Sequence, residues 1–135
     1  MAVLQDATMK PGTCPCGKAA YEACCGRHHG GIAAPDAESL MRSRYSAYVL
    51  ELGPYLLSTW HPDTRPASIG FAKGAKWLGL EIRRFEEAKD SAIVEFVARC
   101  RIGGKAERMH EISRFTLIDG KWLYVDGEFP IRPAC

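Results

Sequence analysis

The feature that most constrains this chain is a cysteine-rich segment near its start. Four of the six cysteines fall between positions 14 and 25. Cysteine thiolates are soft ligands, and four of them suit the tetrahedral shell that Zn²⁺ prefers. Two of these cysteines stand one residue apart, and seven residues separate them from an adjacent pair, so the chain can loop back and close one shell. The segment therefore predicts a single structural zinc ion bound by Cys14, Cys16, Cys24 and Cys25.

Other uses of these cysteines fit the pattern less well. Two disulfides would need an oxidising compartment, and the adjacent Cys24 and Cys25 could bridge each other only with strain. A redox dithiol usually has Cys-x-x-Cys spacing, which the first two cysteines lack. His28 and His29 could replace one of the later cysteines, but four thiolates already complete a structural site. We therefore expect both histidines to be solvated, in a linker.

Composition excludes some partners but does not indicate a reaction. With 18 basic and 16 acidic residues the formal charge is +2, which gives no argument for nucleic acid or an anionic membrane. No apolar run reaches the roughly 18 residues needed to span a bilayer. Residues 1–13 lack the apolar core of a secretory signal, so we interpret them as a loose leader. We expect a cytoplasmic protein whose thiols stay reduced.

The rest of the sequence changes from a helical period to a strand period. A helix is predicted from near Pro35, because apolar and aromatic residues recur at intervals of three and four from Met41 to Leu52. The pair Gly53-Pro54 should end it, and a short helix over 55–60 and an irregular segment over 61–75 should follow. From residue 76 the period is two, in four segments separated by turn-forming pairs at 89–90, 103–104 and 119–120. This order indicates an α+β fold with helices packed on one face of a curved antiparallel sheet.

Two resemblances rest on these residues. Cys-Pro-Cys-Gly followed by Cys-Cys-Gly, over residues 14–26, resembles the SEC-C motif, the zinc-binding tail first known from the secretion ATPase SecA. Nearly the whole chain is similar to the YchJ family of uncharacterised bacterial proteins, through segments 40–48, 59–62, 77–80, 96–99, 113–115 and 122–127. The resemblance implies a leader, a zinc knuckle (residues 14–26) and a linker over 1–34. An NTF2-like, cystatin-like cone over 35–135 would follow.

Such a cone implies an interior pocket, where ligands could bind. Its polar and aromatic candidates are Arg44, Tyr45, Tyr48, Trp60, His61, His110, Arg114, Tyr124 and Asp126. A histidine of this set could form an acid–base pair with Asp126 or Glu111. Packing of the tyrosines and surface pairing of the charged residues explain the same positions more simply, and no known catalytic motif is present. We expect Cys100 to be a buried thiol and Cys135 a free terminal one.

These observations favour a binding protein over an enzyme. SEC-C segments in other proteins resemble docking tags, so the knuckle would present a rigid surface to a protein partner. The alternative is a small-molecule-binding or enzymatic cone pocket, with the knuckle as a structural tag. A closed shell of four cysteines leaves no position for substrate, so catalytic zinc is the least expected use. NTF2-like sheets often pair through an open face, and a homodimer is expected by that analogy.

Overall fold

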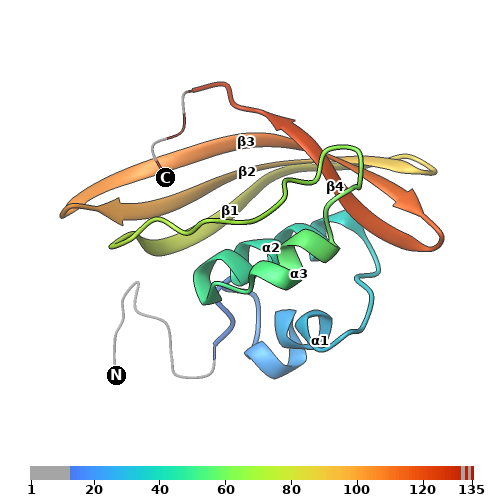
Figure 1. Cartoon of the computed structure of the whole chain (residues 1–135), viewed down its shortest axis with the longest axis horizontal. Coiled ribbons are helices and arrows are strands. Elements are labelled where there is room, and N and C mark those ends of the chain that lie inside the picture. The colour runs from blue at the N-terminus through green and yellow to red at the C-terminus, as the bar shows by residue number, and fades with distance from the viewer. Residues whose placement is uncertain (1–12, 132, 134) are drawn as a thin grey trace.

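A four-stranded sheet covered on one face by helices forms the body of the molecule (Figure 1). The computed structural model describes residues 13–131, 133 and 135, so the leader expected over 1–13 lies, apart from Thr13, outside the described residues. The helical elements are the 3-10 turn η2 (Tyr21–Ala23), α1 (Cys25–His29), α2 (Ala37–Leu50) and α3 (Gly53–Ser58). The strands are β1 (Lys76–Glu87), β2 (Ser91–Ile102), β3 (Lys105–Ile118) and β4 (Lys121–Glu128). The predicted α+β architecture is confirmed.

Helix α2 is delimited by local signals. The side chain of Asp36 accepts a hydrogen bond of 2.7 Å from the Ser39 amide, which caps the first turn. Glu51, at φ 57°, takes the left-handed conformation that commonly ends a helix. Pro54 stands in the first turn of α3, where its missing N–H costs nothing. The predicted break between two helices is present, but it falls at Glu51 and Leu52, and Gly53-Pro54 begin α3 two residues earlier than expected.

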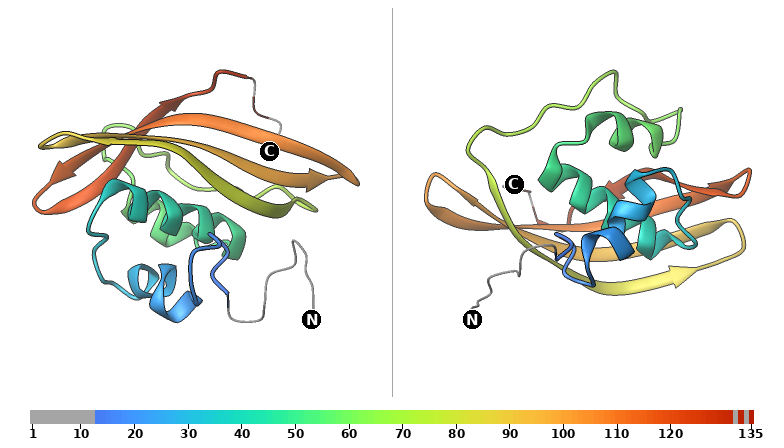
Figure 2. Two further views of the ribbon diagram at one scale, coloured as in Figure 1. Left: turned by 180° about the vertical axis from the view of Figure 1, so that it is seen from behind. Right: turned by 90° about the horizontal axis from the view of Figure 1, so that it is seen from below.

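The sheet is an antiparallel meander in the order β1-β2-β3-β4. The β2–β3 and β3–β4 hairpins turn at the predicted pairs that contain glycine, where Gly103, Gly104, Asp119 and Gly120 all have positive φ. The β1–β2 hairpin turns at the predicted pair 89–90. The register shifts twice between β1 and β2 and once between β3 and β4, at Arg114/Phe115. Such bulges bend and twist strands, so the sheet curves around α2 (Figure 2).

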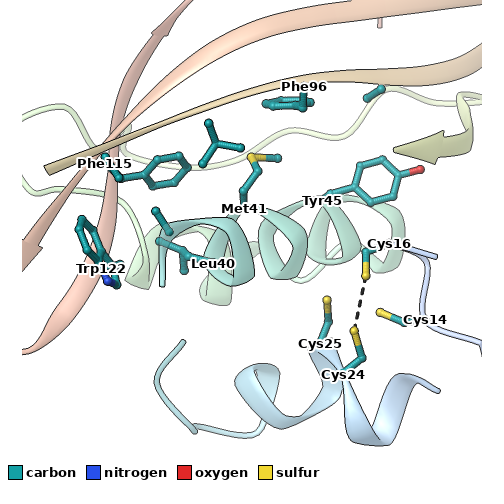
Figure 3. Close-up of a cluster of buried hydrophobic side chains, with 14 residues drawn as sticks. Cys14, Cys16, Cys24, Cys25, Leu40, Met41, Tyr45, Phe96, Phe115 and Trp122 are labelled. Carbon is teal, nitrogen blue, oxygen red and sulfur yellow. Dashed lines mark hydrogen bonds between the residues drawn. The ribbon is translucent and has the colours of Figure 1, made fainter. Parts of the chain in front are cut away.

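The core joins three layers. Helices α2 and α3 lie against the sheet, and α1 lies under α2 on the side away from the sheet (Figures 1 and 2). Apolar side chains of β2, β3 and β4 meet α2 from above, and the four N-terminal cysteines pack beneath it in the same buried cluster (Figure 3). The knuckle therefore shares the core of the α+β domain. None of the helices in the described ranges has the length and apolar character needed to span a bilayer.

Two expectations about single residues are wrong. His28 and His29 are not a solvated linker pair, because they lie in α1, where His28 is 6% exposed and His29 hydrogen-bonds to the backbone of α2. Cys100 is buried as expected, but it is bonded to Cys135 in a disulfide. The chain after β4 therefore returns to β2. Proximity across 35 positions depends on the path of the whole chain, which local patterns do not encode.

Candidate functional site

The four N-terminal cysteines form a compact cluster of buried sulfur atoms. All four Sγ atoms lie within 4.8 Å of one another, and Cys16 Sγ and Cys24 Sγ are 3.5 Å apart. A tetrahedral site with Zn–S bonds of about 2.3 Å has S–S edges of about 3.8 Å, so the cluster fits such a site with small adjustments. Each cysteine is at most 8% exposed. The cluster can hold a metal ion with four soft ligands and no open position.

Short backbone hydrogen bonds shape the loop that carries the first two cysteines. The Gly17 amide donates to the Cys14 carbonyl at 2.8 Å, and the Cys14 amide donates to the Ala19 carbonyl at 2.8 Å. Gly17 has φ 84°, a left-handed conformation that glycine adopts without steric cost. This tight turn brings Cys16 next to Cys14. The cysteines of the second pair are aligned by η2 and the first turn of α1, where the Cys24 amide donates to the Tyr21 carbonyl at 3.0 Å.

Helix α2 holds the cluster from the other side. Cys14 Sγ lies 3.3 Å from Ser46 Oγ, and Arg42 Nη1 donates to the Cys16 carbonyl at 3.3 Å. His29 of α1 links η2 to α2, because its Nε2 lies 2.8 Å from the Ser43 carbonyl oxygen and its Nδ1 lies 2.6 Å from the Tyr21 hydroxyl. These contacts orient the knuckle on α2.

Hydrogen bonds between the thiol groups shift the pKa values of these cysteines in opposite directions. A hydrogen bond from Cys25, opposed by burial, lowers the pKa of Cys16 to about 4. Burial and the hydrogen bond to Cys16 raise the pKa of Cys24 to about 11, and the same two causes raise the pKa of Cys25. Without metal, hydrogen bonding among the thiols thus favours the thiolate form of Cys16 over those of Cys24 and Cys25. A divalent cation would replace the shared protons, as expected for a thiolate metal site.

A second candidate site is a cavity of about 250 Å³ between α2 and the inner face of the sheet. Five of the nine predicted pocket residues line it: Arg44, Tyr45, Tyr48, Trp60 and Tyr124. The other lining residues are Met41, Trp77, Phe96, Met109, Glu111, Ser113, Phe129 and Cys135. Residues 59–61 reach the cavity by pairing with β4, where the Tyr124 amide donates to the Thr59 carbonyl at 2.9 Å.

The other four predicted pocket residues lie outside this lining. His61 lies in the loop after α3, where its Nδ1 accepts from the Asp63 amide at 3.0 Å. His110 pairs with Glu95, at 2.7 Å, on the outer face of the sheet. Arg114 Nε donates to Asp126 at 2.6 Å, also on the outer face. None of the suggested histidine–carboxylate pairs forms among the described residues.

Strand geometry explains this division. Along β3, Glu111 and Ser113 share the inner face with Phe115, so the intervening His110 and Arg114 face outward. Strict alternation along β4 would place Tyr124 and Asp126 on the same face, but the bulge at Arg114/Phe115 separates them. Tyr124 pairs with inward-facing Phe115, whereas Asp126 pairs with outward-facing Arg114.

The alternation on β3 could have identified Ser113 as a lining residue from sequence. The bulge had no comparable signal, because Tyr124 and Asp126 are two positions apart and would be assigned to one face.

Two charged side chains are buried in the cavity wall. Arg44 is 3% exposed, and its Nη1 donates to the Leu56 carbonyl at 2.8 Å and to Thr59 Oγ1 at 2.7 Å. Its guanidinium carbon lies 4.8 Å from the Trp60 ring centroid and 4.6 Å from that of Tyr124. Glu111 is 6% exposed and accepts a hydrogen bond of 2.6 Å from the Tyr124 hydroxyl. Burial raises the pKa of Glu111, although this hydroxyl opposes the shift.

Known proteins are similar to this chain over most of its length. The sequence profile of the YchJ middle NTF2-like domain matches residues 36–127. A UPF0225 protein of Methylibium petroleiphilum is 54% identical over 129 residues, covering 93% of this chain and 95% of that protein. Another, from Chromobacterium violaceum, is 56% identical over 122 residues, covering 84% of this chain and 90% of its own.

Solved structures agree with this assignment. The solution structure of a SEC-C motif containing protein from Rhodopseudomonas palustris superposes with a TM-score of 0.77 at 33% identity, covering 86% of this chain and 97% of that one. The crystal structure of a SEC-C motif containing protein from Psychrobacter arcticus gives a TM-score of 0.74 at 29% identity, covering 90% and 84%. The chain therefore belongs to the UPF0225 family, and it combines a cysteine cluster of the SEC-C type with a YchJ-type NTF2-like domain.

Proposed function

We propose that this protein binds one structural Zn²⁺ through its cysteine cluster and uses the metal-stabilised knuckle to dock onto a protein partner. The observation that carries the proposal is the burial of four cysteine sulfur atoms within 4.8 Å of one another. Four thiolates saturate a tetrahedral zinc ion, which leaves no position for substrate or activated water. The metal would therefore hold a shape and take no part in a reaction.

The surface that this shape presents consists of small and charged residues. We define the knuckle surface as the exposed residues Gly17, Lys18, Ala19, Ala20, Glu22, Ala23 and Arg27. Most of these side chains are short, so the contour of the surface follows the backbone. The backbone in turn is held by the cluster beneath it. A partner that recognises this contour would depend on the metal without contacting it.

An enzymatic use of the cavity has less support. Of the described residues, those that line it include no histidine, and Tyr124 already occupies one oxygen of Glu111. General acid–base catalysis needs a proton donor or acceptor within reach of substrate. Binding is the simpler use of such a site.

Metal analysis tests the first half of the proposal. Protein prepared reduced and with zinc present should contain about one zinc per chain. Cobalt in its place should give the intense sulfur-to-metal absorption of a four-thiolate site. The double substitution Cys14→Ser and Cys24→Ser should abolish both signals, whereas Cys135→Ser, outside the cluster, should retain them. Zinc well below one per chain in the wild type would contradict the site.

Charge reversal on the knuckle surface tests the docking role. Deleting residues 1–30 would remove the buried cluster as well as the surface, so point changes are the cleaner probe. Lys18→Glu with Arg27→Glu should abolish cross-linking of a captured partner to the knuckle while zinc content stays at one. The matched control Lys73→Glu with Lys89→Glu makes the same change in net charge at exposed positions elsewhere. Equal capture by both variants would place the docking surface outside the knuckle.

A further inference from the structure

The cavity has the shape and walls of a small-ligand site. Its volume of about 250 Å³ is many times the roughly 30 Å³ that one water occupies in the liquid, and it approaches the lower end of ligand pockets. Tyr45, Trp77 and Phe96 form part of its lining, and Tyr45 packs edge-on against Trp77 with ring centroids 5.7 Å apart. Figure 3 shows Tyr45 and Phe96 on opposing sides of the space between α2 and the sheet. A flat apolar group suits such walls.

The guanidinium of Arg44 is only partly satisfied. It has five N–H donors, and both hydrogen bonds that it makes come from Nη1. Among the described residues, Nε and Nη2 donate no hydrogen bond and no carboxylate lies within ion-pair distance, although Glu111 is close enough for its charge to act on Arg44. The guanidinium group lies over the ring faces of Trp60 and Tyr124, and this cation–π contact stabilises its positive charge. The ring faces do not accept the hydrogen bonds that the guanidinium N–H groups donate in their own plane. A buried cation of this kind favours an anion as its partner.

Other lining groups also lack partners. Ser113 is fully buried, and within the described ranges its Oγ makes no hydrogen bond of good geometry, although it lies close enough to Glu111 to oppose the rise that burial causes in the pKa of that carboxyl group. Nε1 of Trp60 likewise has no hydrogen-bond partner among the described residues. Buried polar atoms are nearly always paired, so each such atom needs an explanation. Glu111, the one carboxylate side chain in the lining, already accepts from Tyr124. The unpaired groups are thus mainly hydrogen-bond donors, and a ligand with acceptor oxygens would supply the acceptors that they lack.

We propose that this cavity binds a small, flat, apolar monocarboxylate. Its carboxylate accepts hydrogen bonds from Arg44 and Ser113. Its apolar body packs among Tyr45, Trp77 and Phe96. This role is independent of the zinc site and of partner docking, and it adds a ligand-binding function to the NTF2-like domain.

Three molecules of similar size test the charge preference. Benzoate, benzamide and benzylamine share a ring and differ in the charge of the attached group. Each is titrated into the zinc-loaded, full-length protein, and binding is followed by tryptophan fluorescence, since two of the three tryptophans line the cavity. Benzoate should saturate and bind about tenfold or more tightly than benzamide, because charge-assisted hydrogen bonds are the stronger ones. Benzylamine should not saturate. Amide resonances of residues 96–98 and 111–113 should shift with benzoate.

Two variants locate the binding groups. Arg44→Met keeps the apolar stem and should abolish the preference for benzoate over benzamide, whereas Arg99→Met, on the exposed outer face, should leave it unchanged. Since Arg44 also connects α2 to α3, Ser113→Ala provides a second variant, which removes one hydroxyl beside Glu111 and no link between the helices. It should weaken benzoate about three- to tenfold, with exposed Ser91→Ala as control.

Three results would overturn the proposal. Equal affinity for all three molecules would mean that the cavity selects only for shape. Tighter binding of benzylamine would mean that Glu111 sets the charge preference. Failure of benzoate to saturate in the folded, zinc-loaded wild type would mean that the donors are not available to a carboxylate.

Discussion

At the scale of single residues, Gly26 and Gly127 lie so close to neighbouring atoms that neither position has room for a side chain. A Cβ at Gly26 would lie 2.7 Å from the Tyr21 carbonyl oxygen and 2.9 Å from Cε2 of its ring, so the knuckle closes only around a residue without a side chain. A Cβ at Gly127 would lie 2.7 Å from Cδ of Glu111, so β4 makes room in the same way for the buried carboxyl group. Both glycines are required by close approach, since neither has a positive φ.

Gly26→Ala should lower the free energy of unfolding by about 1–3 kcal/mol, because the neighbour it meets is backbone and cannot move aside easily. Gly70→Ala is the control, since its Cβ would meet no atom within 4 Å. Urea denaturation of the zinc-loaded proteins measures both. Equal stability of the two variants would show that the knuckle adjusts without strain.

Glu111→Gln should change how stability depends on pH. Burial raises the pKa of Glu111 above its usual 4.5, so the folded state binds this proton more tightly than the unfolded state does. Its contribution to stability is therefore fully present below about pH 4.5 and is lost as the pH rises through the folded pKa. The stability of the wild type minus that of the variant should fall over this window. Urea denaturation of both proteins from about pH 4.5 to about pH 8 measures the difference. A flat difference would indicate a carboxyl group that is not perturbed.

At the scale of elements, α2 and the C-terminal segment do more than their sequences suggest. Helix α2 contacts the sheet on one side and the cysteine cluster on the other. Its polar residues Ser46 and Arg42 therefore contact the cysteine loop and do not only face solvent. The segment after β4 ends at Cys135, which is bonded to Cys100 of β2 and lines the cavity. The disulfide thus joins the end of the chain to the inner face of the sheet.

Cys135→Ser should destabilise the oxidised protein by about 3–4 kcal/mol, since the crosslink closes a long loop in the unfolded chain, between residues 35 positions apart. Under reducing conditions the variant and the wild type should unfold at the same urea concentration. Thiol titration of the denatured, metal-free, unreduced wild type gives an independent check, with four of six cysteines reactive. Six reactive thiols would mean that the bond does not form.

At the scale of the whole molecule, the knuckle and the α+β domain form one packed unit. The cysteines belong to the same buried cluster as Leu40 and Met41 of α2 and Phe96 of β2. An independent zinc finger would instead have contacts mainly within itself. The stability that metal binding adds, on the order of 10 kcal/mol for structural zinc sites, should therefore reach the body of the fold.

Chelation of the metal should lower the unfolding midpoint of the entire protein and reduce hydrogen-exchange protection in α2 as well as in residues 13–29. The physical reason is that Ser46 and Arg42 of α2 contact the cysteine loop directly. The double variant Cys14→Ser and Cys24→Ser should behave like the chelated protein. If protection in α2 survives metal removal, the knuckle is an appendage whose loss the fold tolerates.

The sequence predicted many features because their signals are local. Spacing alone grouped the four cysteines, and the periods of three to four and of two located α2, α3 and the four strands within a few residues, whereas η2 and α1 were not predicted. The candidate cavity was predicted less well. Arg44 and Tyr124 line it, but His110 and Arg114 face outward, although alternation around Phe115 could have shown this.

By itself, the sequence determined α2, α3, the four strands, their order and the cysteine cluster, because helix period, strand period, turn chemistry and ligand spacing are properties of neighbouring residues. Only the tertiary structure decided that Tyr124 and Asp126 point to opposite faces, that Cys100 meets Cys135, and that the knuckle shares its core with α2. These features depend on a bulge in strand pairing and on packing between segments distant in the chain. Such interactions form only when the whole fold is assembled.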